Sequence, residues 1–315
     1  MKLAAIVLLY NPKPSELETI SSNIKTYAEH CEHIYLVDNS PNMICQEAVE
    51  RLAPNNMMGE SITYIHNANR GGIGGGDNAG IQAAVKDGYE HFITMDQDSS
   101  FLSPEHFRLY KNNVETLMQN DPRIVSCGPL IHNKNSRLSP LAALKSKVLS
   151  PLKKRLLGKK YAPSSSEYES KDKLIRSGNI VSTETWKNCG KFDETLIVSE
   201  VDYDFCYRLK KDGHKLVRLN RHILMQYAGE KRRFSIFPKF LNRYTDTRYY
   251  FNIRNAYIMR ERHPEHAEYY KTYLRKLYAD FCMNTIHPLK HREIWNKARN
   301  DSEKMIAEYR CKTMT

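Results

Sequence analysis

The feature that most restricts the fold of this chain is an alternation of apolar runs and helix-like segments over roughly the first 130 residues. Apolar runs of strand length stand at LAAIVLLY (3–10), HIYLVDNS (33–40), SITYIHN (61–67) and HFITMD (91–96). Residues 14–30 and 78–91, which lie between such runs, place apolar side chains at helical spacing. Strands that alternate with helices form parallel sheets, because each crossover returns the chain to the same end. We therefore expect an α/β fold with a doubly wound sheet, followed by helices beyond residue 248.

Polar segments follow each of these expected strands. They are Tyr10 with Asn11, Asp38 with Asn39, residues 67–76 and residues 96–98. In open parallel sheets, ligands bind beyond the carboxyl ends of the strands. The sequence therefore predicts that the four segments meet at one edge of the sheet and form a binding site there.

Two carboxylates, Asp96 and Asp98, end a strand that should be buried, and no basic residue stands near them in the sequence. Mg²⁺ or Mn²⁺ often takes only one or two protein oxygens and completes its shell with water and substrate phosphates. A turn cap at Asp96 and a solvated Asp98 would also explain the pair. Their position beside three other polar strand ends favours a metal site.

The glycine-rich stretch NRGGIGGGDNAGI (69–81) suggests a phosphate or sugar partner. Glycine lets the backbone approach a ligand closely, and the stretch precedes an expected helix, whose N-terminus favours anions. It is not a Walker loop, because no Gly-Lys-Ser/Thr follows, and it lies on the wrong strand–helix turn for a dinucleotide fingerprint. A flexible loop is the alternative.

A third acidic site is SEVDYDFCYRL (199–209), with Glu200, Asp202 and Asp204 at the start of an expected helix. An acid placed there can lie beside the metal site and act as a general base. Carboxylates are also favourable at any helix N-terminus, whatever their function. The residues alone leave the two interpretations equal.

Residues 136–173 break the strand–helix pattern, and residues 145–160 hold seven Lys or Arg and no acid. Mixed with leucines, these cations suggest an interrupted amphipathic segment that lies on anionic lipid. The expected membrane-docking residues are Lys153, Lys154, Arg155, Lys159 and Lys160. A solvated basic loop is the alternative.

Composition narrows the class of protein further. The chain has 315 residues, is 41% hydrophobic and carries a formal charge of +12, which suits an anionic membrane surface, a phosphorylated ligand or nucleic acid. We expect no nucleic-acid partner, because the basic residues are not interleaved with aromatics and no recognition motif occurs. The N-terminus does not have the pattern of a signal peptide, and no run of eighteen apolar residues occurs. Seven scattered cysteines without a CxxC pair suggest reduced thiols, so we expect a cytoplasmic protein.

In these motifs and their order, the chain resembles the bacterial family 2 glycosyltransferases, and most closely their rhamnosyltransferase branch. The segments that carry the resemblance are VLLYNP, VDNS, NRGGIGGGDNAGI, ITMDQDSSF, IRSGNIVS, GKFDETLIVSEVDYDFCYR and RYYFNIRN. The resemblance implies a GT-A fold, a Rossmann-like mixed sheet flanked by helices, over residues 1–250. The expected parts are a nucleotide-sugar half (about 1–130), the basic insertion (about 136–173), an acceptor half (about 174–250) and C-terminal helices (251–315).

The resemblance also implies roles for single residues. Asp98, with Asp96 assisting, would hold Mg²⁺ or Mn²⁺ against the donor diphosphate, and Asp202 would be the base. Asp38 would face the nucleotide base. The implied donor-binding residues are Tyr10, Asn11, Asp38, Asn39, Asn69, Arg70, Asn78, Gln97 and Arg248. Ser177, Gly178, Glu200 and Arg208 would support the acceptor or the helix start.

The activity implied is an inverting, metal-dependent transfer of rhamnose from dTDP-rhamnose to a growing cell-surface polysaccharide. The acceptor would be carried on a polyprenyl diphosphate, so the enzyme would lie peripherally at the inner face of the plasma membrane. Alternatives are a UDP-hexose or UDP-galactofuranose donor, a nucleotidyltransferase and a basic nucleic-acid-binding protein. Two departures stand out: Glu200 competes with Asp202 as base, and Gln226 stands where many relatives carry a metal-site His.

Overall fold

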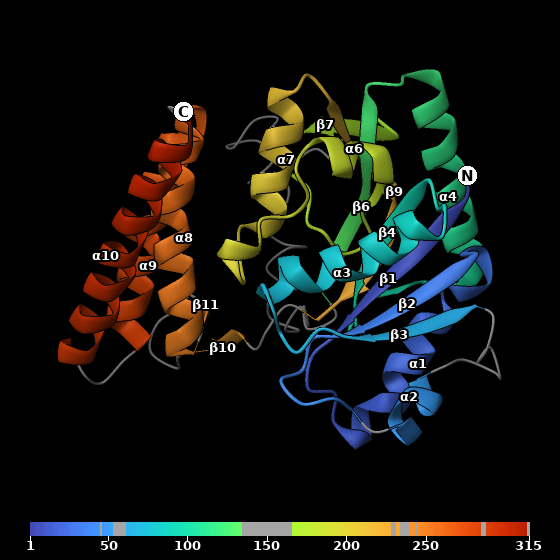
Figure 1. Cartoon of the computed structure of the whole chain (residues 1–315), viewed down its shortest axis with the longest axis horizontal. Coiled ribbons are helices and arrows are strands. Elements are labelled where there is room, and N and C mark those ends of the chain that lie inside the picture. Colours follow the sequence, from blue (N-terminus) through green and yellow to red (C-terminus); the bar gives the residue numbers. More distant parts are fainter. Residues whose placement is uncertain are drawn as a thin grey trace, which may run out of the picture.

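The computed structural model describes residues 1–44, 46–52, 61–133, 166–227, 231–233, 240–242, 245–284 and 288–313 (Figure 1). Its strands are β1 (Leu3–Leu9), β2 (His33–Asp38), β3 (Ile62–His66), β4 (His91–Asp96), β5 (Ser100–Phe101), β6 (Ile124–Asn133), β7 (Tyr168–Lys171), β8 (Ile180–Ser182), β9 (Lys215–Gln226), β10 (Lys231–Arg233) and β11 (Phe240–Asn242). Its α-helices are α1 (Leu17–Lys25), α2 (Gln46–Leu52), α3 (Gly72–Lys86), α4 (Pro104–Asn120), α6 (Thr183–Asn188), α7 (Val201–Lys211), α8 (Asp246–Arg262), α9 (Ala267–Asn284) and α10 (Pro288–Thr313). The expected alternation of strands and helices is confirmed.

Four parallel strands form the first half of the main sheet, in the order β3-β2-β1-β4. In their register, Leu9 pairs with Asp38, and Leu8 pairs with Asp96. The neighbouring strands therefore end at the same edge, and the polar residues that follow them emerge together.

The second half of the sheet is mixed. Strand β8 runs antiparallel between β4 and β6, and β6 is parallel to β9. Strands β5 and β7 add to β9 in the antiparallel sense. Because β7 belongs to the sheet, the last part of the expected insertion at 136–173 is regular structure. The docking residues Lys153, Lys154, Arg155, Lys159 and Lys160 lie outside the described residues.

Two cores cover the two faces of the sheet. Along β1, Ala4, Ile6 and Leu8 point to one core, and the residues between them point to the other. Such a strand is apolar throughout because both of its faces are buried. Helices α1, α2 and α4 pack on one face, and α3, α6 and α7 on the other.

The C-terminal helices α8, α9 and α10 lie side by side at one end of the molecule (Figure 1). Their residues Ile253, Tyr270 and Ala298 are fully buried in the same core as Ala4 and Ile6 of β1. The boundary expected at residue 250 falls inside α8, because this helix packs against both the sheet half and the later helices. None of the helices that the structure describes has the length and apolar character of a membrane-spanning segment.

Candidate active site

A pocket of about 450 Å³ opens at the carboxyl ends of the parallel strands. Among the expected site residues, it is lined by Tyr10, Asn39, Asn69, Asp96, Gln97, Asp98 and Arg248. All four polar segments that follow the strands contribute to this lining. The structure therefore brings them together at one edge of the sheet, as the strand pattern predicts.

Asn39 organises the base of this pocket. It is 2% exposed, and its amide nitrogen donates to the carbonyl oxygen of Gly72 at 2.8 Å and to Oδ1 of Asn69 at 3.1 Å. Its own Oδ1 accepts from Nδ2 of Asn67 at 2.7 Å. One buried amide thus holds the loop after β3 against the end of β2. Across the pocket, the backbone N–H of Tyr10 donates to Oε1 of Gln97 at 2.8 Å, and the Tyr10 side chain is exposed.

Asp38, which the resemblance expects to face the nucleotide base, is not among the residues that line the pocket. It is fully buried, and its carboxylate accepts from the backbone N–H of Ser40 at 2.9 Å and of Ile44 at 3.0 Å. The hydroxyl of Tyr64 donates to the same carboxylate at 2.7 Å. With these three hydrogen bonds, Asp38 fixes the loop after β2.

Asn78 also lies outside the lining. Its Nδ2 donates to the carbonyl oxygen of Phe192 and to Glu194, both at 2.9 Å, and its Oδ1 accepts from Nε1 of Trp186 at 3.2 Å. It therefore fastens α3 to the segment that leads into α7.

Asn11 and Arg70 are exposed and do not line the pocket either. The backbone N–H of Asn11 donates to Oγ of Ser40 at 2.7 Å, and Nε of Arg70 donates to the carbonyl oxygen of Asn67 at 3.1 Å. Both residues make these contacts within the loops that follow the strands.

The glycine-rich segment is the first turn of α3 and not a loop before it, because the helix begins at Gly72. A Cβ on Gly72 would stand 2.1 Å from the carbonyl oxygen of Ile197, and one on Gly75 would stand 2.0 Å from that of Arg70. Gly72 and Gly75 therefore admit other parts of this chain. They let α3 contact the segment that forms the opposite wall of the pocket.

Asp96 and Asp98 have different surroundings. Oδ1 of Asp96 accepts from Arg176, and its Oδ2 accepts from Nε2 of Gln226 at 2.6 Å. Each carboxylate oxygen of Asp96 therefore has one side-chain partner in this structure. Asp98 is half-buried at the wall of the pocket. The basic partner missing from the local sequence comes from a residue 80 positions later.

Sequence reasoning missed a buried ion pair behind the pocket, between Arg176 and Asp77. Arg176 is 7% exposed, and one of its terminal nitrogens lies 2.8 and 3.1 Å from the two oxygens of Asp77, which is fully buried. Burial raises the pKa of Asp77 to about 7, although the Arg176 charge acts to lower it. The sequence did offer a clue to this pair, because Arg176 stands in IRSGNIVS and Asp77 stands in GGGDNAG, and both stretches belong to segments that carry the family resemblance.

Ser177 and Gly178 hold the turn that contains Asp96. Oγ of Ser177 accepts from the backbone N–H of Asp96 at 3.2 Å and donates to Oγ of Ser99 at 2.9 Å. Gly178 has a φ of +80°, which favours glycine, and its N–H donates to the carbonyl oxygen of Thr94 at 2.7 Å.

The two candidate bases point to different neighbours. Glu200 is 6% exposed and accepts from the hydroxyl of Tyr270 in α9 at 2.6 Å. Burial raises the pKa of Glu200 to about 7. Asp202 is half-buried, and burial raises its pKa while the charge of Arg176 lowers it. Neither residue lines the pocket itself, but Asp202 lies beside Arg176, which contacts Asp96.

Arg208 braces α7 at a distance from the pocket. Its Nε donates to Asp204 at 2.9 Å, and its terminal nitrogens donate to the carbonyl oxygens of Cys189 and Lys191. These contacts fit the expected support of the helix.

A strained segment before α7 forms one wall of the pocket through Ile197 and Val198. Ile197, Ser199 and Glu200 have φ values of +61°, +67° and +65°, which cost on the order of 1–3 kcal/mol each. Nδ2 of Asn255 in α8 contacts the carbonyl oxygens of Leu196, Val198 and Ser199 at 2.8, 2.9 and 3.0 Å. Helix α8 therefore maintains this wall, which the sequence did not indicate.

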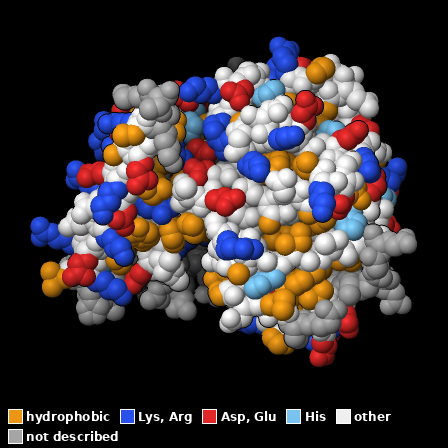
Figure 2. Space-filling view, in the orientation of Figure 1, with side chains coloured by type: hydrophobic (Ala, Val, Ile, Leu, Met, Phe, Trp, Pro, Cys, Tyr) orange, Lys and Arg blue, Asp and Glu red, His pale blue; other side chains and the backbone are white. Residues whose placement is uncertain are grey.

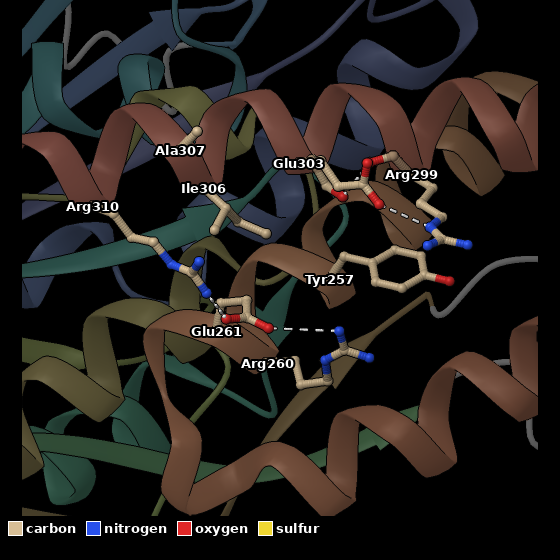
Figure 3. Close-up of a pocket in the computed structure, with 9 residues that line it drawn as sticks. Tyr257, Arg260, Glu261, Arg299, Glu303, Ile306, Ala307 and Arg310 are labelled. Carbon is tan, nitrogen blue, oxygen red and sulfur yellow. Dashed lines mark hydrogen bonds and ion pairs between the residues drawn. The ribbon is translucent and has the colours of Figure 1, made fainter.

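A second cavity, of about 510 Å³, lies between α8 and α10 (Figure 3). Its cations are paired within the cavity. Arg299 donates to Glu303 at 2.9 Å, Arg310 donates to Glu261 at 2.7 Å, and Arg260 lies 3.6 Å from Glu261. No strand end lines this cavity, and each of the three arginines named above has a carboxylate partner. The pocket at the sheet edge is therefore the better candidate for a catalytic site.

No group of three or more His, Cys, Asp or Glu side chains converges to hold a metal among the described residues. A closed metal cage is therefore absent from that part of the chain. Mg²⁺ requires less, because one carboxylate with water and substrate phosphates completes its shell. Asp98 at the pocket wall fits such an open site.

Comparison with known proteins gives three findings. The model of the family described as "Glycosyl transferase family 2" matches residues 4–168, slightly more than half of the chain. The dTDP-rhamnosyl transferase RfbF of Shigella flexneri is 24% identical over 256 residues, which cover 81% of this chain and 78% of that protein. The crystal structure of GalNAc-T7 with UDP, GalNAc and Mn²⁺ aligns with a TM-score of 0.54 and 14% identity. That alignment covers 98% of this chain and 56% of the GalNAc-T7 chain.

Proposed function

Because the chain belongs to glycosyl transferase family 2, we propose that it transfers a sugar from a nucleoside-diphosphate donor to an acceptor hydroxyl with inversion at the anomeric carbon. Its fold is the GT-A fold, which it shares with solved glycosyltransferases. The observation that carries the proposal is the pocket at the strand ends, where Asp98 and Arg248 line one cavity with the amides of Asn39 and Asn69. A cation ligand, a positive charge and hydrogen-bonding amides together suit a sugar diphosphate.

Asp98 would hold Mg²⁺ or Mn²⁺ together with the donor diphosphate. When bound, the metal ion would stabilise the negative charge that builds on the leaving diphosphate. Arg248, at the exposed start of α8, would add a second positive charge to the same group. Asp96 would support Asp98 through the turn and not as a ligand.

Asp202 would take the proton of the attacking acceptor hydroxyl. A single carboxylate is enough for direct displacement, whereas retention by double displacement would need a second, nucleophilic carboxylate, by analogy with glycosidases. The contact of Glu200 with Tyr270 supports assigning the base to Asp202, because it turns Glu200 toward α9.

We propose dTDP-rhamnose as the donor. The support is the likeness to the dTDP-rhamnosyl transferase RfbF over most of both chains. A UDP-hexose or UDP-galactofuranose donor is the second candidate, and its support is that the GalNAc-T7 structure, which has a similar fold, contains UDP.

A growing cell-surface glycan on a polyprenyl diphosphate is the proposed acceptor, which would hold the enzyme at an anionic membrane. The support is the basic composition of residues 145–160. In a flotation assay, wild type should rise with phosphatidylglycerol vesicles, and high salt should release it. A variant with Lys153, Lys154, Arg155, Lys159 and Lys160 changed to Gln should stay at the bottom. Wild type that never floats would contradict this proposal.

A donor screen tests the central proposal. Melting temperatures are measured with dTDP-rhamnose, UDP-glucose, UDP-galactose and UDP-galactofuranose, each with Mg²⁺ or Mn²⁺. Stabilisation grows with the logarithm of ligand concentration over its dissociation constant, so the true donor gives the largest shift. The nucleotide product is then identified with and without acceptor. Release of a nucleoside diphosphate supports glycosyl transfer, whereas a new phosphodiester would indicate a nucleotidyltransferase and overturn the proposal.

A further inference from the structure

One buried guanidinium connects the pocket with the helix that carries the proposed base. Arg176 contacts Asp77 of α3 and Asp96 at the end of β4 through its two terminal nitrogens. The carboxylate of Asp202 in α7 lies close to the backbone of the same residue and feels its charge. Arg176 therefore stands between the turn that presents Asp98 and the helix start that presents Asp202.

The backbone of Arg176 is fixed relative to β4. Its carbonyl oxygen accepts from Oγ1 of Thr94 at 2.5 Å and from the backbone N–H of Asn179 at 3.0 Å. The guanidinium is a planar fork that can serve two carboxylates at once, whereas a lysine ammonium is a single point of charge. The fixed backbone of Arg176 and its forked side chain together define the position of Asp96.

The electrostatic balance around Arg176 is uneven, because one cation faces three aspartates. Asp77 and Arg176 are almost wholly removed from water, so charges there interact more strongly than at the surface. Burial raises the pKa of both Asp77 and Asp202, and the charge of Arg176 opposes that rise at each. The ionised form of Asp202, which a general base needs, is thus favoured by this cation.

We propose that Arg176 is a positioning residue for the transfer reaction: its guanidinium fixes Asp96 in the turn that presents Asp98, and its charge balances that of Asp202. The inference rests on the proposed function, because it takes Asp202 as the base. Arg176 touches neither donor nor acceptor in this scheme and acts through the two aspartates.

The test measures kcat/KM against pH for matched variants. Replacing Arg176 alone would leave Asp77 buried without its cation and could unfold the protein. Arg176→Gln is therefore combined with Asp77→Asn, and Asp77→Asn alone is the reference. The groups that face Asp202 are Arg176, Asp77 in α3, and Glu200, Tyr203 and Cys206 in or next to α7.

The double variant should move the acidic limb of the profile relative to the Asp77→Asn reference. Because burial raises the pKa of Asp77 to about 7, Asp77 carries little charge at lower pH, and Asp77→Asn alone should leave the limb at the wild-type pH or slightly below it. The double variant also removes the cation, which raises the pKa of Asp202 and shifts the limb to higher pH. Its kcat at pH 7 should fall at least about tenfold, with part of the loss recovered at pH 9.

Two further variants separate positioning from general stability. Arg176→Lys keeps the charge but not the fork, so it should restore the position of the limb without restoring the full kcat. Arg262→Gln removes a different, mostly buried arginine that pairs with Asp193 outside the pocket. It should lower the melting temperature and leave the limb where it is.

An acidic limb that stays at its wild-type pH in the double variant would overturn the inference, whatever the rate. Wild type that transfers no sugar from any nucleoside-diphosphate donor would instead overturn the proposed function, and the inference with it. Because the first result needs an active wild type, the two failures are distinguishable.

Discussion

Asp96 and Asp98 stand two positions apart in the chain but have different surroundings. Asp96 is held by Arg176 and Gln226, which donate one hydrogen bond to each of its two carboxylate oxygens. Asp98 lies at the pocket wall, where a cation and a diphosphate can share it. Gln226 contacts Asp96 in this structure.

Asp98→Asn should reduce turnover by about 100-fold or more, because metal-ion stabilisation of the leaving group contributes several kcal/mol. The side chain is half-buried at a pocket wall, so the melting temperature should change little. Steady-state rates with Mn²⁺, and with EDTA, measure the effect. Full activity in the variant, or in wild type treated with EDTA, would rule out the role of Asp98.

Asp202→Asn should lose about a hundred- to ten-thousand-fold in kcat and still bind donor. The base acts only when ionised, so wild-type kcat/KM should fall as pH drops through the pKa of Asp202, which burial raises above its usual range. The variant should lack this limb. Donor affinity by calorimetry and rates between pH 5 and 9 give the comparison.

Glu200→Gln is the matched control for Asp202, because Gln keeps an acceptor for the hydroxyl of Tyr270. It should retain most of the turnover. Burial raises the pKa of Glu200 to about 7, so the folded state keeps a proton that the unfolded chain releases at lower pH. Wild-type stability from this group is therefore lost as pH rises toward 7. The variant should gain in melting temperature relative to wild type between pH 5 and 8, and an inactive Glu200→Gln would move the base to Glu200.

At the scale of a single element, helix α8 has two structural roles. Its first turns line the pocket through Thr247, Arg248 and Phe251, and a later turn carries Asn255, which holds the strained wall. Residues in left-handed conformations persist where the surrounding structure over-determines them. The wall of the pocket therefore depends on a helix that begins at Asp246, 48 positions after Val198.

Asn255→Ala should destabilise the protein by about 1–3 kcal/mol, because buried carbonyl oxygens lose their donor. The wall should also relax toward ordinary backbone conformations, so the KM for the donor should rise. Urea unfolding and donor titration measure the two effects. Asn300→Ala, at an exposed site on α10, is the control and should match wild type. Unchanged stability in Asn255→Ala would mean that the wall does not depend on this amide.

The sequence predicts the parallel half of the sheet because each strand there is a local apolar run, as at residues 91–96. It does not predict that α3 begins at Gly72, since glycine disfavours helices and only close packing against Ile197 overrides that preference. The Arg176–Asp96 contact is also hidden, because its partners are 80 residues apart. Seven of the expected site residues line the pocket, and Asp38 and Asn78 do not, because their polar atoms are used by the loops beside them.

At the scale of the whole molecule, the C-terminal helices complete the core that covers one face of the sheet. Tyr270, Leu274 and Leu277 of α9 and Ala298 of α10 are at most 6% exposed. Each buried side chain of the larger kind contributes about 1.5–3 kcal/mol, and net stabilities are only about 5–15 kcal/mol.

Truncation after residue 262 should therefore give a protein that aggregates or lacks a cooperative melting transition. Truncation after residue 307 is the control, because residues 308–311 are exposed, and it should melt close to wild type. Differential scanning calorimetry makes the comparison. A cooperative transition in the shorter chain would show that the sheet half is stable without α9 and α10.

The positive net charge is not gathered into one patch on the face of the molecule that Figure 2 shows. Lys and Arg side chains are interspersed there with Asp and Glu (Figure 2). A nucleic-acid footprint would instead be a continuous basic stripe. This face gives no support to the nucleic-acid alternative.

The two hydrogen-bond partners of Asp96 have a consequence for the order in which the protein can fold during synthesis. Its two partners, Arg176 and Gln226, follow it by 80 and 130 residues. At about 5–20 residues per second, the second partner leaves the ribosome roughly 7–26 s after Asp96. During that interval, strands β1 to β4 can pair, but their acidic edge lacks the cation that later neutralises it. A pause in translation between these points would therefore hold a nascent chain in which strands β1 to β4 are paired but the pocket at their carboxyl ends is still incomplete.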